Sequence, residues 1–322
     1  MERYLPEGVI ISTKENVALT STPDGLERAM KEAITIEATA VMCDEDLNLY
    51  FRLGDGKIKG IMPRNECAFN PMGGEIKDIA VLTRVGKPVA CKVLALEYRN
   101  GEAVAILSRR QAQLEFYRNR FPYIRSGDVV NAVITHLESF GAFVDIGCGV
   151  CSLLSVDCIS ISRISHPKDR LKCGMQLDVI VKSVDADSFR IFVTLKELLG
   201  TWEENARAFN VGQTVTGIVR SVESYGAFIE LAPNLAGLAE LRDAWPYDPS
   251  ALVGKSVSVY IKSIIPERMK IKLVIIDVCR EGRREDDLKA YFRKVGSGHI
   301  SRWRYSPICS ARVVESVFDD VQ

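Results

Sequence analysis

Several features that would assign this chain of 322 residues to a simple class of protein are scarce or absent. Net charge is absent, because 42 Lys and Arg balance 42 Asp and Glu, which argues against a histone-like or polybasic binder. No run reaches the roughly 18 consecutive apolar residues of a membrane helix. The N-terminal MERYLPEGVI is neither a signal nor a transit peptide. We therefore expect a soluble, unexported, cytoplasmic protein with no membrane partner.

Residues and motifs that carry catalysis are also few. The chain has three histidines, no GxxxxGK[ST] phosphate loop and no HExxH metal motif. Nine cysteines are scattered through it without the short, dense framework of a secreted disulfide protein, which favours reduced thiols. We therefore expect a protein that is not an enzyme.

What the sequence does have is an internal repeat. GDVVNAVITHLESFGAFVDI begins at Gly127 and GQTVTGIVRSVESYGAFIEL begins at Gly212, an offset of 85 residues. A second similarity follows in each copy, in GMQLDVIVKSVDAD from Gly174 and GKSVSVYIKSIIPE from Gly254. GKPVACKVLALEYRNGEAVAILSRR from Gly86 indicates a fainter copy before them. Because similarity at a fixed offset marks a repeated structural unit, we expect three copies of one module.

Each copy has the pattern of a small barrel. Apolar residues alternate, β-branched residues are abundant and turn residues recur every ten or so positions, which is typical of short antiparallel strands. Five strands in about 70 residues suit a closed barrel, which buries one face and has no open edge. Gly141 and Gly226 lie between aromatic residues, where we expect a bulge or a tight corner in mid-strand. The predicted class is all-β with linker helices, as three tandem five-stranded OB-fold barrels.

Segments of helical composition separate the copies. Good helix formers and no proline occur in SRRQAQLEFYRNRF, from Ser108, and in KELLGTWEENARAF, from Lys196. The first carries five Arg and one Glu up to Arg125, and we expect those arginines to form a solvated helix face. The tail is expected to form a helix with a short hairpin, or a partly ordered extension. The expected divisions are 1–29 (extension), 30–110 (first barrel), 111–125 (basic linker helix), 126–197 (second barrel), 198–211 (linker helix), 212–277 (third barrel) and 278–322 (extension).

The repeated pattern, Gly-x-x-Val followed by Phe/Tyr-Gly-Ala-Phe-Val/Ile-Asp/Glu and a later Val-Lys-Ser or Ile-Lys-Ser strand, resembles the S1 RNA-binding domain of the largest protein of the bacterial small ribosomal subunit. The resemblance covers residues 30–277, weakly in the first copy. It implies that single-stranded RNA crosses one barrel face and stacks on aromatic residues, beside a histidine and a basic residue. Residues implied to bind RNA are Phe140, Phe143, Tyr225, Phe228, Lys182, Arg190, Lys262 and Lys270.

The family's histidine is not carried over. The matching positions hold Ser155 and Glu240, and Glu240 would repel a phosphate. His166 lies near the expected RNA face and is a candidate substitute, although His166 and His136 are more typical of surface or loop residues than of ligands. The first copy lacks the aromatic motif. Its GIMPRNE, from Gly60, and its closing LSRR resemble opening repeats of the family that dock on protein, which implies a protein partner for residues 30–110.

Other interpretations of these residues stay open. One ring of each aromatic pair is expected in the core if the barrel buries alternate positions. Lys182 and Arg190 are equally consistent with ordinary solvated charges. Cys148 and Cys151, followed by Cys158 and Cys173, have a spacing that starts like a zinc site. The later gaps are irregular and the third copy has no cysteine at this place, so we expect no metal and no cofactor.

The leading hypothesis is a non-catalytic, bacterial, cytoplasmic protein that holds single-stranded mRNA along tandem barrels and acts in translation on or near the small ribosomal subunit. The alternative is a regulator whose degenerate barrels bind ribosomal or polymerase proteins, which the neutral charge and Glu240 favour. An RNA-processing enzyme is the third hypothesis, and the sequence offers it no catalytic domain or motif.

Overall fold

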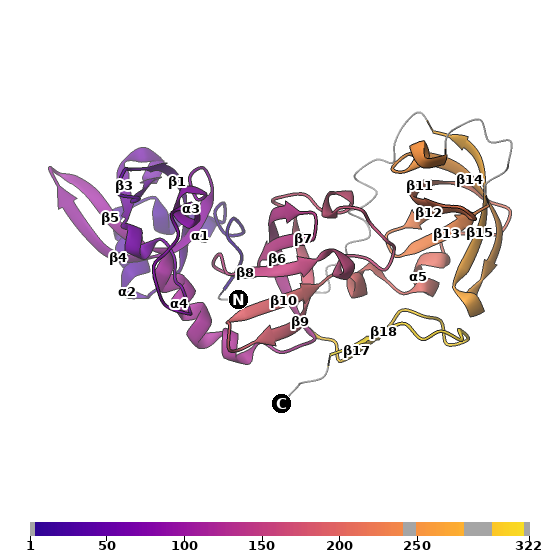
Figure 1. The fold of residues 1–322 in the computed structure, drawn as a ribbon. Coiled ribbons are helices and arrows are strands. Elements are labelled where there is room, and N and C mark those ends of the chain that lie inside the picture. Colours follow the sequence, from indigo (N-terminus) through magenta and orange to yellow (C-terminus); the bar gives the residue numbers. More distant parts are fainter. Residues whose placement is uncertain (1–3, 241–248, 280–297, 319–322) are drawn as a thin grey trace.

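The computed structural model describes residues 4–240, 249–279 and 298–318, and it contains three small β-barrels that follow one another along the chain (Figure 1). The first barrel consists of β1 (Ile36–Cys43), β2 (Leu49–Leu53), β3 (Ile58–Met62), β4 (Pro88–Arg99) and β5 (Glu102–Ser108). The second consists of β6 (Asp128–Glu138), β7 (Gly141–Asp145), β8 (Cys151–Ser155), β9 (Gln176–Asp185) and β10 (Arg190–Thr194). The third consists of β11 (Thr214–Glu223), β12 (Gly226–Ala232), β13 (Leu235–Ala239), β14 (Ser256–Ile265) and β15 (Lys270–Val278).

All three barrels share one topology. The first three strands form a meander, the fifth strand pairs in parallel with the third, and the first strand pairs with the fourth to close the barrel. The prediction of three five-stranded barrels is confirmed. The glycine that opens each fourth-strand repeat makes the closure possible: the N–H groups of Gly86, Gly174 and Gly254 donate to carbonyls of the first strands at 2.7–2.8 Å. These residues have φ between +77° and +83°, a conformation that favours glycine.

Each barrel buries its own apolar core. Alternation along the strands is clear in β8, where Ser152 and Leu154 are buried while the side chains on either side are more exposed. Helices α1 (Lys14–Thr20) and α2 (Pro23–Lys31) cover the first barrel and add Leu19, Leu26 and Ala29 to its core. Helix α3 (Asp78–Leu82) precedes β4. No helix among the described residues is long and apolar enough to cross a membrane.

The two linkers differ from one another. Helix α4 (Arg109–Asn119) follows the first barrel, and the hydroxyl of Ser108 caps it by accepting the Gln111 N–H at 2.9 Å. The prediction that all the linker arginines are solvated is wrong for Arg109, whose side chain is buried in an ion pair. The second linker is not one helix, because Gly200, at φ +86°, separates a 3₁₀ turn at Lys196–Leu199 from α5 (Trp202–Ala206).

The C-terminal segment spans the second and third barrels (Figure 1). Strand β16 (Gly298–His299) pairs with the start of β6, and β17 (Arg302–Arg304) pairs with β18 (Glu315–Val317) as a hairpin. Tyr305 packs into the core of the third barrel and Phe318 into that of the second. The helix expected in the tail would fall within residues 280–297, outside the described residues.

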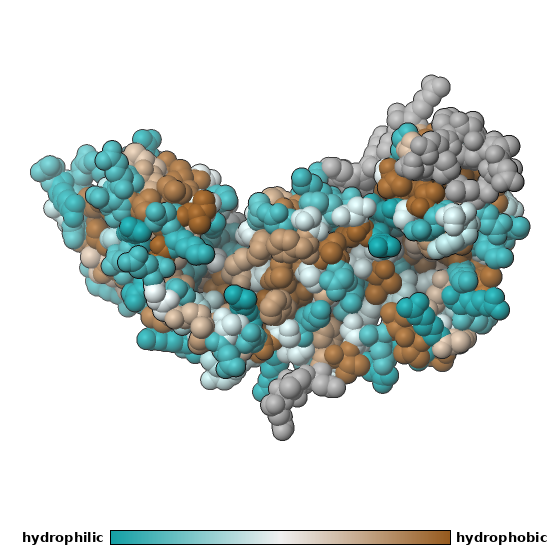
Figure 2. Space-filling model, viewed as in Figure 1, coloured by the Kyte–Doolittle hydropathy of each residue, from teal (hydrophilic) through white to brown (hydrophobic). Residues whose placement is uncertain are grey.

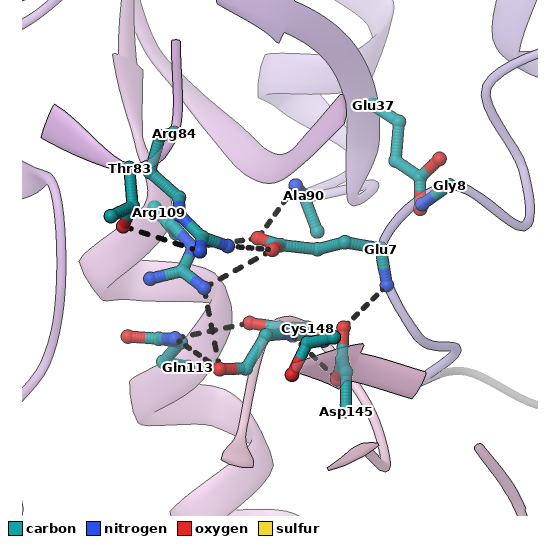
Figure 3. Close-up of polar contacts among 12 residues, drawn as sticks. Glu7, Gly8, Glu37, Thr83, Arg84, Ala90, Arg109, Gln113, Asp145 and Cys148 are labelled. Carbon is teal, nitrogen blue, oxygen red and sulfur yellow. Dashed lines mark hydrogen bonds and ion pairs between the residues drawn. The ribbon is translucent and has the colours of Figure 1, made fainter. Parts of the chain in front are cut away.

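The N-terminal segment joins the first two barrels (Figure 3). The carboxylate of Glu7 accepts from Nε of Arg109 at 2.6 Å and from Nη1 of Arg84 at 3.2 Å. The N–H of Glu7 donates to Asp145 of β7 at 2.7 Å. Burial and the nearby Glu7 carboxylate raise the pKa of Asp145. One residue therefore connects α4, the first barrel and the second barrel.

The second and third barrels meet at another buried ionic cluster. Glu230 of β12 pairs with Arg170, which precedes β9, and with Arg220 of β11 at 2.5 Å. The side chains of Arg170 and Glu230 are fully buried. Nearby, Nδ2 of Asn234 donates to the carbonyls of Lys196 and Gly200 at 2.7 and 3.0 Å. These contacts fix the orientation of the third barrel against the second.

We predict that Glu7→Gln destabilises the junction of the first two barrels. The amide removes the charge that compensates the buried Arg109 guanidinium, and breaking a buried pair from one side costs about 3–5 kcal/mol. The thermal unfolding midpoint should fall clearly. Glu15→Gln, which makes the same change on the exposed face of α1, should leave the midpoint nearly unchanged, and equal effects of the two variants would contradict this account.

Candidate nucleic-acid interface

One row of outward-facing positions crosses each barrel at the same height. In the second barrel, His136 lies opposite Phe143, Phe143 opposite Leu153, Leu153 opposite Phe192, and Phe192 opposite Ser183. A bulge at Thr135 in β6 and another at Lys182 in β9 set this register. The sequence predicts a bulge or a tight corner in mid-strand at Gly141 and Gly226. These glycines instead begin β7 and β12, and the bulges lie on the neighbouring strands at Thr135 and Arg220.

Three rings gather on this face of the second barrel. Phe140 is 53% exposed, and its ring centroid lies 6.0 Å from that of the half-buried Phe143 in an edge-to-face arrangement. The imidazole of His136 lies almost parallel to the ring of Phe143, at 6.4 Å between centroids and 25° between planes. The two predicted phenylalanines are therefore together on the surface, with one more open to solvent than the other.

His136 is the residue that the sequence interpretation missed. It lies on the first strand rather than on the third, where the family's histidine is expected. A sequence signal for His136 was available, because it occupies the position of the first strand that pairs with Phe143, the second ring of the motif. Its Nε2 lies 2.6 Å from Oε1 of Glu138, which places a carboxylate at the rim of the face.

His166 has a different place. It lies in the segment between β8 and β9, where Nδ1 accepts the Lys168 N–H at 3.1 Å and its own N–H donates to Asp169. Asp169 in turn pairs with Arg220 of the third barrel. Among the described contacts, none joins His166 to Phe140 or Phe143, so it is positioned as a cap beside the junction of the second and third barrels.

The two predicted cations of the second barrel differ in their surroundings. Arg190 is exposed at the start of β10, two residues before Phe192 and so on the same face. Arg190 also contributes to lowering the pKa of Asp185, which hydrogen bonds from Ser188 lower most. Lys182 occupies the bulge of β9, where its Nζ donates to the thiol of the buried Cys158 at 3.3 Å.

The third barrel repeats the face with fewer rings. Tyr225 is 61% exposed and lies 6.2 Å from the half-buried Phe228, again edge to face. Lys272 lies where the second barrel has Phe192, and Ser221 lies where it has His136. The predicted cations Lys262 and Lys270 are both exposed, as is Glu240 just after β13.

The first barrel keeps the row but changes its chemistry. The pairing places Met42, Tyr50, Ile61, Ile106 and Ala95 at these positions. The first copy does lack the aromatic motif, yet Tyr50 provides one ring at the place of Phe143, and its hydroxyl donates to Asp44 at 2.9 Å. The remaining side chains are aliphatic.

The cysteines of the zinc hypothesis have separate environments. Cys148 is buried against Ala90 and Ala112, and burial raises its pKa to about 12. Cys158 is buried beside Lys182, whereas Cys151 and Cys173 are exposed. Within the described ranges no three His, Cys, Asp or Glu side chains are grouped as metal ligands.

We predict that Gly141→Ala disrupts both the fold and the face of the second barrel. A Cβ at this position would lie 2.5 Å from the Leu154 carbonyl oxygen, so the β7–β8 pairing that presents Phe143 must shift. Thermal unfolding should report lost stability. Gly298→Ala, in the exposed strand β16, is the matched control, because it too lacks a positive φ and has nothing within 4 Å of the added carbon. A Gly141 variant no less stable than the Gly298 variant would argue against this packing constraint.

Comparison with known proteins assigns one of these barrels to a family. Residues 123–196 match the S1 RNA binding domain. The bS1 homolog of Bacillus cereus, a small ribosomal subunit protein, is 30% identical over 64% of this chain and 56% of its own length. The bS1 protein of Staphylococcus saprophyticus is 34% identical over 59% of this chain and 50% of its own length.

The bS1 protein of Rhizobium meliloti is 28% identical over 68% of this chain and 39% of its own length. The chain thus spans about half the length of the curated relatives it matches. It carries an S1 RNA binding domain in its second barrel and is similar to the small ribosomal subunit proteins bS1.

Proposed function

We propose that this protein binds single-stranded RNA without catalysing a reaction on it, and that it acts in translation at the small ribosomal subunit in the cytoplasm. The observation that carries the proposal is the group of Phe140, Phe143 and His136 on one face of the barrel that matches the S1 RNA binding domain. The names of the bS1 relatives supply the ribosomal context.

Stacking is the chemistry that this face offers. Every base has a planar π-face, so an exposed ring binds bases with little regard to sequence, at about 1–3 kcal/mol per base. Phe140 provides an open ring, while Phe143, supported by His136, provides a second plane at a steep angle to the first. Arg190, on the same face, provides a guanidinium for a phosphate or for a further base.

The third barrel is proposed as the weaker RNA-binding module. It has the aromatic pair, and Lys270, Lys272 and Lys262 add positive charge. It lacks a ring at Ser221, however, and the exposed Glu240 follows β13 at the edge of this face. Because the buried cluster around Glu230 fixes the two barrels, RNA bound on one presents its next segment to the other at a raised effective concentration.

A second candidate function belongs to the first barrel. Met42 is 52% exposed, and Leu94, in the bulge that corresponds to Lys182, is 42% exposed. Beside Ile61 and Ile106 they make the equivalent face of this barrel aliphatic, which suits contact with a protein better than base stacking. We infer that residues 30–110 dock on a protein partner, in the ribosomal context on a protein of the small subunit.

We predict that the two aromatic pairs contribute unequally to RNA affinity. Replacing Phe140 and Phe143 by Ala should weaken binding of a single-stranded oligonucleotide more than replacing Tyr225 and Phe228, by about 1–3 kcal/mol for each lost stack. Fluorescence anisotropy with labelled oligouridine at low salt measures both. If neither pair matters, or if no RNA binds, the protein-binding function of the barrels takes precedence.

The charge of the face provides the control for this experiment. Arg190→Gln should lower the slope of log affinity against log salt by about 0.7, the value for one phosphate contact on a single strand. The aromatic variants should keep the slope of the unmodified protein. Arg312→Gln, an exposed arginine in the C-terminal segment, should alter neither affinity nor slope.

We predict that the protein sediments with the small ribosomal subunit at low salt. A variant with Met42→Lys and Leu94→Lys should leave this fraction, because charge on the aliphatic row opposes an apolar contact while both positions stay exposed. The Phe140 and Phe143 double variant should remain with the subunit. Loss of sedimentation only in the aromatic variant would show that RNA, rather than the first barrel, holds the protein there.

A further inference from the structure

A cavity of about 610 Å³ lies between the first and second barrels, on the border of the aromatic face. The first barrel contributes Arg84, Lys87 and Pro88 to its walls, and the N-terminal segment contributes Glu7 and Gly8. The second barrel contributes residues 133–136 of β6, with Cys173, Gly174, Gln176 and Asp145. In the space-filling view the surface is hollowed between these two barrels (Figure 2).

This cavity is continuous with the proposed stacking face. His136 belongs to both, because it lines the cavity and lies parallel to Phe143 at 6.4 Å. The preceding residue, Thr135, also lines the cavity, and its hydroxyl donates to the carbonyl of Phe143 at 3.0 Å. An RNA chain that stacks on Phe143 therefore continues from that ring into the mouth of the cavity.

Lys87 is the cation available to a ligand in this cavity. It is exposed, and within the described ranges no ion pair or side-chain hydrogen bond involves its ammonium group. Arg84 is mostly buried and engaged by Glu7, whose carboxylate also binds Arg109. Asp145 accepts backbone N–H groups and is buried.

The remaining acidic group near the cavity is at its rim. Glu138 faces His136, with 2.6 Å between the nearest atoms, and so its charge is directed at the imidazole. The opposite wall, at Cys173, Gly174 and Gln176, carries no formal negative side chain. The cavity thus combines an unpaired ammonium on one wall with neutral polar groups and the buried Asp145 on the other.

The position of Lys87 relative to the rings is fixed by buried contacts. The Gly8 N–H donates to Glu37 of β1 at 3.1 Å, while Glu7 connects Arg84 of the first barrel to Asp145 of the second. The N–H of Ala40 donates to the Lys87 carbonyl, which holds this segment on β1. A ligand that spans the two barrels therefore pays little to order them.

We propose that the cleft between the first and second barrels is a backbone subsite for single-stranded RNA, in which Lys87 contacts a phosphate of the nucleotides next to those stacked on Phe140 and Phe143. This inference rests on the proposed function. It gives the first barrel, whose own face is aliphatic, a part in RNA binding that adds affinity without reading bases.

The first test compares Lys87→Gln with Lys57→Gln, which removes the same charge from an exposed position of the same barrel. Affinity is measured for oligouridines of about 4 and about 16 nucleotides, the limits of site size for one OB fold. Lys87→Gln should weaken the long oligomer several-fold, lower its salt slope by about 0.7 and leave the short one unchanged. Lys57→Gln should change none of these. Unchanged binding of the long oligomer by Lys87→Gln overturns the proposal.

The second test uses a native cysteine as a reporter. Cys173 is exposed and lines the cleft, whereas Cys309 is exposed in the C-terminal segment. Bound 16-mer should slow maleimide labelling of Cys173, read by mass spectrometry, and leave Cys309 unaffected; the short oligomer should protect neither. Equal labelling of Cys173 with and without the long RNA contradicts the subsite.

The two proposals fail in distinguishable ways. If the Phe140 and Phe143 double variant loses affinity while Lys87→Gln binds normally and Cys173 stays reactive, RNA binding stands and the subsite is wrong. If neither oligomer binds the unmodified protein, the proposed function is wrong and the subsite falls with it.

Discussion

The arrangement of the three barrels depends on a buried carboxylate that the repeat supplies twice at the same place. Asp145 and Glu230 each follow the second ring of the aromatic motif by two residues. The side chain two positions along a strand from an outward ring shares its face. At each acid a neighbouring segment lies against the barrel, since Asp145 binds the N-terminal segment and Glu230 binds Arg170. Burial of such a charge is tolerated only where partners compensate it, so both junctions are specific.

Under the proposed function, these junctions have a consequence for RNA binding. Freely linked barrels would search for one strand independently, and each would lose entropy on binding. The ionic clusters and the C-terminal segment, with Tyr305 in one core and Phe318 in another, hold the faces in a fixed series instead. Glu7 and Asp145 of the first junction also line the cleft beside Lys87.

The outer row shows how one topology can carry side chains of different chemistry. Its positions are set by the barrel register, and the side chains there do not contribute to the core. His136, Phe143 and Phe192 make the row of the second barrel aromatic, whereas Met42, Ile61 and Ile106 make that of the first barrel aliphatic. The side chains of the row thus differ between the two barrels, while the closure through Gly86 and Gly174 is the same.

Much of the fold could be predicted from the sequence, because the determinants of a small barrel are local. The 85-residue repeat, the alternation of apolar residues and the glycines at the turns identify strands and their order, and the motif identifies Phe140, Phe143, Tyr225 and Phe228 as a surface set. Only the tertiary structure decided what lies beside them. Cross-strand register places His136 against Phe143, whereas His166 caps a turn through its own neighbours Lys168 and Asp169. Likewise Arg109 looks like any arginine of a basic linker until a segment about 100 residues earlier buries it with Glu7. Residues distant in sequence meet only when the barrels pack against each other. The junctions and the cleft could therefore be identified only from the tertiary structure.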